Sequence, residues 1–183
     1  MAGRNIQSKF SAKLLKPITA STEWAFVVLP HEASDKLPRR GRTSVDVTLN
    51  DVNFRMQLEP DGQRSHWLKI EKDILNLAGL TYGDTGQFEI SAVDQEPEPA
   101  IPSDLNEALN QSPKAKAIWL QTTTLARVDW IHWITTAKQA KTRSKRIHDA
   151  TDMLSSGKKR VCCFDPSGFY SKALSAPEFD GSI

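Results

Sequence analysis

The sequence has only two cysteines, and they are neighbours, Cys162 and Cys163. A disulfide between adjacent residues would strain the backbone, so we expect reduced thiols and no structural disulfide. Neither a CxxC pair nor a metal-ligand spacing accompanies them, which argues against a redox centre and against a metal site. Both cysteines are therefore predicted to be partly buried as small apolar side chains.

Long apolar runs are missing too. The longest, from Trp24 to Leu29, is far shorter than the roughly 20 residues of a membrane-spanning helix. The N-terminal segment MAGRNIQSKF contains no apolar stretch of the kind found in a secretory signal. We expect a protein of the cytoplasm with no transmembrane segment.

Recognisable catalytic motifs are also missing. The histidines at positions 31, 66, 132 and 148 show no HExxH or other paired spacing. The sequence before Ser167 lacks the glycine of a GxSxG nucleophile elbow. Asp and Glu residues are scattered without pairing. These absences argue against an enzyme and against a bound cofactor.

Positive charge is distributed unevenly along the 183 residues, whose net charge is +2. Residues 1–99 carry 12 Lys and Arg against 14 Asp and Glu, whereas residues 127–160 carry nine against three. Such a concentration predicts a surface for an anionic partner: an acidic protein, lipid headgroups or nucleic acid. The residues predicted to form it are Lys138, Lys141, Arg143, Arg146, Lys158, Lys159 and Arg160. The pattern leaves open whether the chain is a monomer or a homodimer.

The first half of the chain has the pattern of short strands broken by turns. Apolar and polar residues alternate on either side of Asn50-Asp51, which predicts a hairpin. The expected strands are 10–14, 23–30, 45–49, 52–58, 66–70 and 85–93, with short helices at 31–37 and 71–80. This order predicts a small β-barrel domain over residues 1–94.

An acidic, proline-rich segment follows, DQEPEPAIP, which predicts a linker over residues 95–102. Helices are expected at 104–110, 113–120, from Thr123 or Thr124 to about 140, and from a Thr142 cap to Gly157. They define a helical domain over residues 103–160, and an irregular tail follows over 161–183. The predicted fold class is α+β, a barrel with short helices followed by a helical segment packed on it.

Two helix faces bear on the function. In the third helix the apolar arc contains Trp130 and Trp133, so both rings are predicted to be buried, whereas His132 lies on the polar side and should be solvated. In the fourth helix Arg143 lies on the apolar stripe. It is either a structural clamp between the helices and the barrel or an anion-binding group.

The helical half resembles the bacteriocin-protection (YdeI/OmpD-associated) family. The resemblance is carried by an aromatic helix, an Ala-Lys pair, a Thr-Arg-x-x-Arg-Ile motif and a Gly-Lys end. These correspond to Trp130, Ile131, Trp133, Ile134, Ala137, Lys138, Thr142, Arg143, Arg146, Ile147, Gly157 and Lys158. The family name implies a role in tolerance of antimicrobial peptides, and it assigns that role to no residue.

The first half resembles the uncharacterised small-barrel domain that often precedes that family. The matching features are the strand from Trp24 to Pro30, the hairpin from Val45 to Leu58 and the Gly83-Asp84 turn. The resemblance implies a double-split β-barrel-like fold, similar in architecture to swapped-hairpin bacterial transcription factors.

Three functions remain open from the sequence. The favoured one is a non-catalytic binding or accessory protein that presents its basic helical surface to an anionic partner. Nucleic-acid binding is the alternative, because a barrel akin to DNA-binding ones stands next to basic and aromatic residues. An enzyme is the least favoured, since no catalytic constellation is visible.

Overall fold

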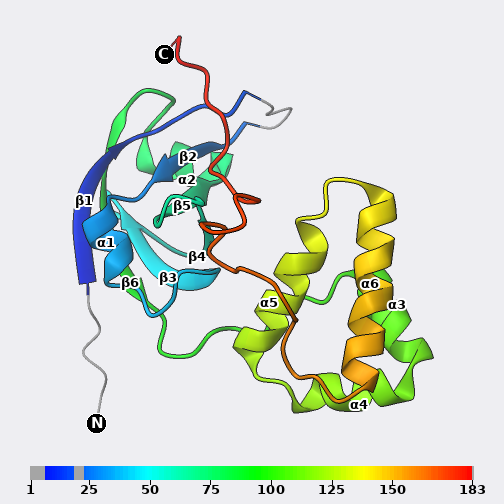
Figure 1. Cartoon of the computed structure of the whole chain (residues 1–183). Coiled ribbons are helices and arrows are strands. Elements are labelled where there is room, and N and C mark those ends of the chain that lie inside the picture. The colour runs from blue at the N-terminus through cyan, green and yellow to red at the C-terminus, as the bar shows by residue number, and fades with distance from the viewer. Residues whose placement is uncertain (1–6, 19–22, 183) are drawn as a thin grey trace. The chain divides into compact units, whose positions relative to one another are not determined.

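The computed structural model describes residues 7–18 and 23–182 of the chain (Figure 1). These residues form two compact units. The first comprises the described residues up to Gln95 together with those from Ser167 onward, and the second is Glu96–Pro166. The α+β fold class is confirmed, with a curled antiparallel sheet followed by helices. That the helices pack on the barrel stays a prediction.

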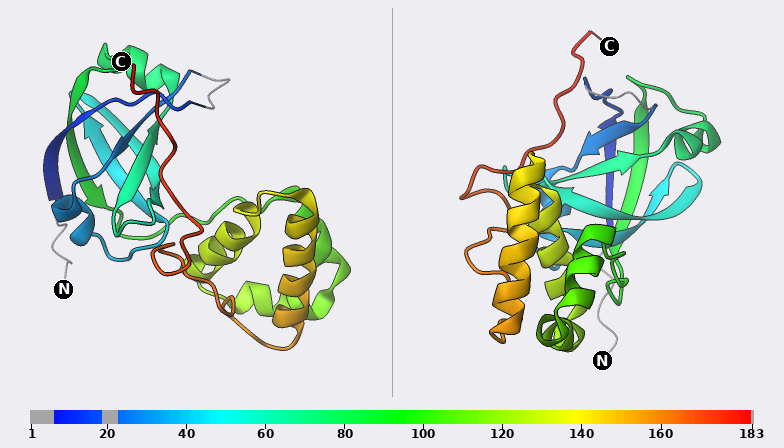
Figure 2. Two further views of the ribbon diagram at one scale, coloured as in Figure 1. Left: turned by 45° about the horizontal axis from the view of Figure 1, so that its top comes forward. Right: turned by 90° about the vertical axis from the view of Figure 1, so that its right-hand side faces the viewer.

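Six antiparallel strands build the first unit. They are β1 (Gln7–Lys13), β2 (Ala25–Val28), β3 (Thr43–Leu49), β4 (Val52–Pro60), β5 (His66–Ile70) and β6 (Thr85–Ala92). Their order in the sheet is β1-β6-β3-β4-β5-β2. The sheet curls until its two ends meet, where Leu15 and Phe26 exchange backbone hydrogen bonds of 2.9 and 3.0 Å (Figure 2). The curling encloses one side of every strand.

Alternation along the strands decides which side chains enter this enclosed core. In β3, Val45, Val47 and Leu49 are buried and Asp46 is exposed. The β3–β4 hairpin turns at Asn50, whose φ of 52° is the left-handed conformation that tight hairpin turns require. Two short helices accompany the sheet, α1 (His31–Asp35) and α2 (Lys72–Ala78). The predicted hairpin and both short helices are confirmed.

The C-terminal segment from Ser167 belongs to the first unit. Pro17 and Phe179 form an isolated antiparallel bridge, flanked by backbone hydrogen bonds of 2.9 Å from Ile18 to Glu178 and from Asp180 to Lys16. Further upstream the segment passes close to Gly62, because a Cβ placed there would lie 2.1 Å from the carbonyl oxygen of Leu174. The described part of the tail from Ser167 onward therefore docks along the barrel unit.

Four helices form the second unit: α3 (Ser103–Gln111), α4 (Pro113–Gln121), α5 (Thr124–Thr135) and α6 (Ala140–Ser155). Their shared core consists of Leu105, Leu109, Ala115, Trp119, Trp130, Ile131, Ile134, Ile147, Ala150 and Leu154. The amphipathic stripes predicted for the third and fourth helices thus meet one another.

Two helix boundaries differ from the prediction by more than two residues. α5 ends at Thr135 rather than near 140, because Thr135 and Thr136 turn their hydroxyls onto the carbonyls of the preceding turn. α6 begins at Ala140 after Gln139, so Thr142 lies inside the first turn and is not the cap. Ala140 and Lys141 are good helix formers, which favours the earlier start.

Candidate functional site

Arg143 is an ion-pair partner within the helical unit. Its Nε and Nη2 donate to the two carboxylate oxygens of Asp104 at 2.6 and 3.0 Å, so the pair joins α6 to the first turn of α3. The guanidinium hydrogen bond holds the pKa of Asp104 below its usual range, and the carboxylate raises that of Arg143. A clamp was expected between the helices and the barrel. The clamp instead joins two helices, because α3 presents the aspartate.

Arg146 holds the end of α5. Its Nη1 donates to the backbone carbonyl of Trp133 and, at 3.3 Å, to the hydroxyl of Thr136. The guanidinium carbon lies 5.5 Å from the centre of the Trp133 ring. Carbonyls at a helix end lack partners within the helix, so this arginine satisfies one of them. Arg143 and Arg146 thus both have partners inside their own unit.

The other five predicted binding residues are exposed and lie at two ends of α6. Lys138 and Lys141 flank its start, and Lys158, Lys159 and Arg160 follow its end. A helix of 16 residues is about 24 Å long, so roughly that length of helix separates the two groups. The structure does not bring the seven predicted residues together on one surface.

The three consecutive cations after α6, which we call the 158–160 cluster, have a fixed backbone. Gly157 and Lys158 donate their N–H groups to Leu154 and Met153 at 2.8 and 3.0 Å, in the pattern that closes many helix ends. The carbonyl of Lys159 accepts from the indole nitrogen of Trp130 at 3.4 Å. The cluster therefore has an ordered backbone and exposed side chains.

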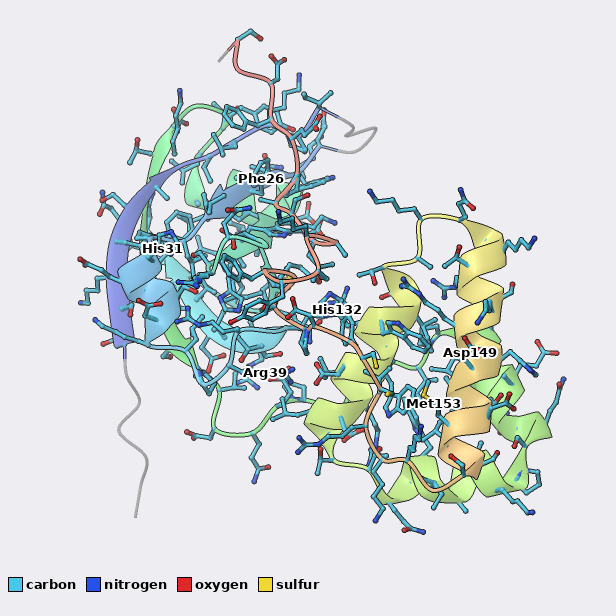
Figure 3. All side chains as sticks on the ribbon, in the orientation of Figure 1. Phe26, His31, Arg39, His132, Asp149 and Met153 are labelled. Carbon is cyan, nitrogen blue, oxygen red and sulfur yellow. The ribbon has the colours of Figure 1, made fainter. Side chains whose placement is uncertain are left out.

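The aromatic residues of α5 are partly as predicted. Trp130 is fully buried and Trp133 is half-buried. His132, predicted to be solvated, is buried at 1% exposure on α5 (Figure 3). Its ring meets the Phe164 ring edge-on, with centroids 5.2 Å apart. The prediction was wrong because the chain returns after α6 and covers this face of α5.

The cysteines also differ from the prediction. Cys162 and Cys163 are both exposed, although they were expected to be partly buried as small apolar side chains. They occupy a turn, and the apolar residue before them, Val161, is the one that packs against the helical core. A turn places its central side chains outward, which the residue types alone do not indicate.

A buried serine–histidine pair lies in the barrel unit and was not predicted. The Ser34 hydroxyl is 2.8 Å from Nδ1 of His66, and Nε2 donates to the carbonyl of Gly41 at 3.0 Å. Burial lowers the pKa of His66, which keeps the ring neutral. Because a carbonyl occupies Nε2 and both side chains are sealed from solvent, this pair ties α1 to the start of β5. Its members are 32 residues apart, and no local pattern could have revealed it.

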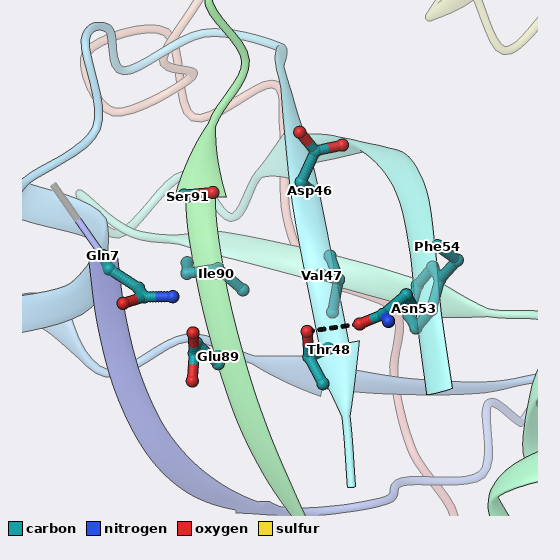
Figure 4. A pocket seen from close by; sticks show the side chains of 9 residues that line it. All are labelled: Gln7, Asp46, Val47, Thr48, Asn53, Phe54, Glu89, Ile90 and Ser91. Carbon is teal, nitrogen blue, oxygen red and sulfur yellow. Dashed lines mark hydrogen bonds between the residues drawn. The ribbon is translucent and has the colours of Figure 1, made fainter. Parts of the chain in front are cut away.

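A polar hollow of about 340 Å³ lies on the outer face of the sheet (Figure 4). Its polar side chains come from β1, β3, β4 and β6, and several of them pair with a neighbour across the strands. Thr48 donates to Asn53 at 2.6 Å, and the carboxylate of Asp46 accepts from Arg55, which lowers the pKa of Asp46. These contacts characterise a solvated sheet face whose groups satisfy one another.

The described residues include no group of three or more His, Cys, Asp or Glu side chains placed to hold a metal ion. None of the helices in the described part of the chain is long and apolar enough to cross a membrane.

Comparison with protein families supports both resemblances. Residues 98–157 match the family described as bacteriocin-protection, YdeI or OmpD-associated, and residues 10–90 match a domain of unknown function, DUF1905. The first match spans α3 to α6, and the second spans most of the barrel. No curated protein matches the chain. The helical region is thus similar to the bacteriocin-protection (YdeI or OmpD-associated) family, and most of the barrel before it is similar to DUF1905.

Proposed function

We propose that this protein is a non-catalytic binding protein and that its 158–160 cluster engages an acidic segment of a partner protein. The family name links it to protection against bacteriocins. The observation that carries the proposal is the cluster itself. It has three adjacent exposed cations on an ordered backbone, and none of the ion pairs among the described residues involves them.

The basic charge of the helical unit is divided between structural and available groups. Arg127, Arg143 and Lys145 pair with Glu98, Asp104 and Asp149. The 158–160 cluster follows the C-terminal end of α6, where the helix dipole favours cations. That attraction leaves the charged head groups in solvent, so they can still meet a carboxylate.

An acidic protein is favoured over the other two anionic partners. Stacking of bases needs accessible aromatic rings, and in the helical unit Trp119 and Trp130 are buried. Lipid binding by a helix needs an apolar face beside the cations, and Ile147, Ala150 and Leu154 of α6 all lie in the core. Charge pairing with carboxylates needs neither feature.

The protein is further proposed to catalyse no reaction and to reside in the cytoplasm. The buried Ser34–His66 pair resembles part of a hydrolase site only in residue type, since it is sealed from any substrate. Adjacent exposed thiols that are not joined in a disulfide suit a reducing compartment.

The test compares matched pairs of charge reversals at the two ends of α6. Lys158→Glu with Lys159→Glu removes two cluster cations, and Lys138→Glu with Lys141→Glu is the control. Binding of a fluorescein-labelled polyglutamate peptide is measured by anisotropy at low salt. We expect the first variant to lose binding and the control to keep it. Equal loss in both variants would show that only net charge matters and would contradict a local site.

Two further probes decide the class of partner. Random duplex DNA and vesicles containing phosphatidylglycerol are titrated under the same conditions. Binding through about three phosphate contacts would fall with salt at a slope near −3, which distinguishes it from a larger interface. If duplex DNA or vesicles bind more tightly than polyglutamate, and the same variant abolishes that binding, the acidic protein partner is wrong.

A further inference from the structure

The two cysteines after α6 form a turn that brings their sulfur atoms together. The Sγ atoms of Cys162 and Cys163 are 3.3 Å apart, and both residues are exposed. Neighbouring side chains of an extended chain point to opposite faces. Here Cys163 has a φ of 59°, in the left-handed region that non-glycine residues seldom adopt. The backbone therefore places both thiols on the same side.

This turn is held on both sides. Before it, the carbonyl of Lys159 accepts from Trp130, and Val161 packs against the helical core. After it, Phe164 packs edge-on against the buried His132 ring. Anchors on either side limit the motion of the turn, so a ligand that bridges both sulfurs meets them already near their bound spacing.

The sulfur spacing distinguishes between possible ligands. A tetrahedral zinc site needs more ligands than this pair, and the described residues hold no group of three or more metal-ligating side chains. A linear two-coordinate ion with bonds of about 2.3 Å would need sulfurs about 4.6 Å apart. One atom that binds both sulfurs at about 2.3 Å with an angle near 90° spans about 3.3 Å. The observed separation is 3.3 Å.

We propose that Cys162 and Cys163 form a chelating site for trivalent arsenicals, namely arsenous acid and its monosubstituted organic derivatives. Trivalent arsenic is pyramidal, prefers sulfur ligands, and brings its own third substituent, so two thiolates complete its coordination. With a monosubstituted arsenic oxide, the arsenic–oxygen bond breaks, two As–S bonds form, and both thiol protons leave with the oxygen as one water. With arsenous acid, two As–OH bonds break, and the two hydroxyls leave with the two thiol protons as two waters. Arsenic stays trivalent, and no oxidant or reductant takes part. This site is independent of the 158–160 cluster.

The raised pKa of Cys163 fits a chelator better than a single nucleophile. The hydrogen bond with Cys162 is the largest influence on Cys163, and it raises the pKa of the Cys163 thiol. A thiol that stays protonated near neutral pH reacts slowly with electrophiles that need one thiolate. A reagent that binds two thiols gains affinity from the second bond, because once the first bond has formed the other sulfur is already within reach.

Phenylarsine oxide is the probe for the test. It is titrated against the full-length native protein and followed by intact mass, with 2,3-dimercaptopropanol as competitor for the apparent Kd. We expect one phenylarsenic group per chain and the loss of both thiol hydrogens. Cys162→Ser and Cys163→Ser should each raise the apparent Kd by about 100-fold or more, since one bond replaces two. Thermal melting confirms that both exposed substitutions leave the fold intact.

Three results would overturn the proposal. The first is the absence of a 1:1 adduct, and the second is unchanged affinity in either serine variant. The third comes from a peptide with the sequence of residues 158–166. It contains the same cysteines without the anchors and should bind about tenfold more weakly than the protein if the fold sets the sulfur spacing. Equal affinity of peptide and protein would show that the fold contributes nothing.

Discussion

Arg143 and Asp104, which are 39 residues apart in the sequence, face each other across α6 and α3 through two parallel hydrogen bonds. This geometry uses the planar fork of the guanidinium, which a lysine cannot reproduce. The side chains of Arg143 and Asp104 are 32% and 42% exposed, so solvent screens the attraction. The pair therefore orients the two helices more than it stabilises them.

Replacing Arg143 with lysine tests that geometry. We expect Arg143→Lys to lower the free energy of unfolding of the helical unit by about 1 kcal/mol. The reason is that a lysine makes a single charged contact with Asp104 in place of two parallel hydrogen bonds. Urea unfolding followed by far-UV circular dichroism measures the change. Lys145→Arg, on the exposed side of the same helix, is the control and should have almost no effect. A larger loss of unfolding free energy in the control would contradict a role for the guanidinium geometry.

Lowering the pH should remove the contribution of the Arg143–Asp104 pair to the free energy of unfolding. The hydrogen bond from Arg143 lowers the pKa of Asp104 in the folded state, so the pair stabilises the fold above the ordinary aspartate pKa of about 3.9. As the pH falls below that value, the unfolded chain takes up the proton first and the advantage disappears. The difference between wild type and Arg143→Lys should therefore shrink between pH 5 and the folded pKa, as urea titrations at successive pH values would show. A difference that stays constant down to that point would contradict the assignment.

His66 predicts a second pH dependence in the barrel unit. Burial lowers its pKa in the folded state, so below about 6.5 the unfolded chain binds a proton that the folded one does not. Stability should fall as the pH is lowered through this window, by up to about 1.4 kcal/mol per pH unit. His66→Gln should lack this part of the slope. The other three histidines are common to both proteins, so the difference between the two unfolding curves isolates His66.

The close approach of Leu174 to Gly62 allows the docking of the C-terminal segment to be tested. An alanine there would be strained by the φ of 72° and would also collide with the carbonyl of Leu174. We expect Gly62→Ala to destabilise the full-length protein by about 2 kcal/mol or more, and to increase trypsin cleavage after Lys172. In a chain that ends at residue 166 only the strain of about 1 kcal/mol should remain. Equal penalties in both backgrounds would show that the tail does not contact Gly62.

Leu154 tests the core of the helical unit. It is fully buried in α6, and Leu154→Ala should lower the free energy of unfolding by about 2–5 kcal/mol through lost contacts and a cavity. Leu120→Ala, at an exposed position of α4, is the matched control and should change it by less than about 0.5 kcal/mol. Similar effects in both variants would contradict the assignment of this core.

Much of the architecture follows from local sequence patterns. Alternation on both sides of Asn50 predicted the β3–β4 hairpin, because a strand exposes every second residue to the core. The periodic apolar residues around Trp130 and Ile147 predicted two amphipathic helices, which meet in one core. These features depend on neighbours within a few residues, so a single sequence contains enough information for them.

The candidate site was less predictable, since its charges depend on partners that are distant in the sequence. Charge counting placed seven cations on one surface, but Arg143 binds Asp104 and Arg146 caps α5, and the remaining five lie at two ends of α6. A helix length separates the two exposed groups, and this separation follows only from where α6 begins and ends.

The sequence by itself determined the order and type of the elements, the resemblance of each half to a known family and the stretch that carries the basic charge. Only the tertiary structure decided that His132 is buried, that Cys162 and Cys163 share one exposed side of a turn, and that the segment from Ser167 docks on the barrel unit. Periodicity reports which face of an element is apolar. It does not report which distant segment returns to cover a face, and that return sets the burial and pairing of these residues.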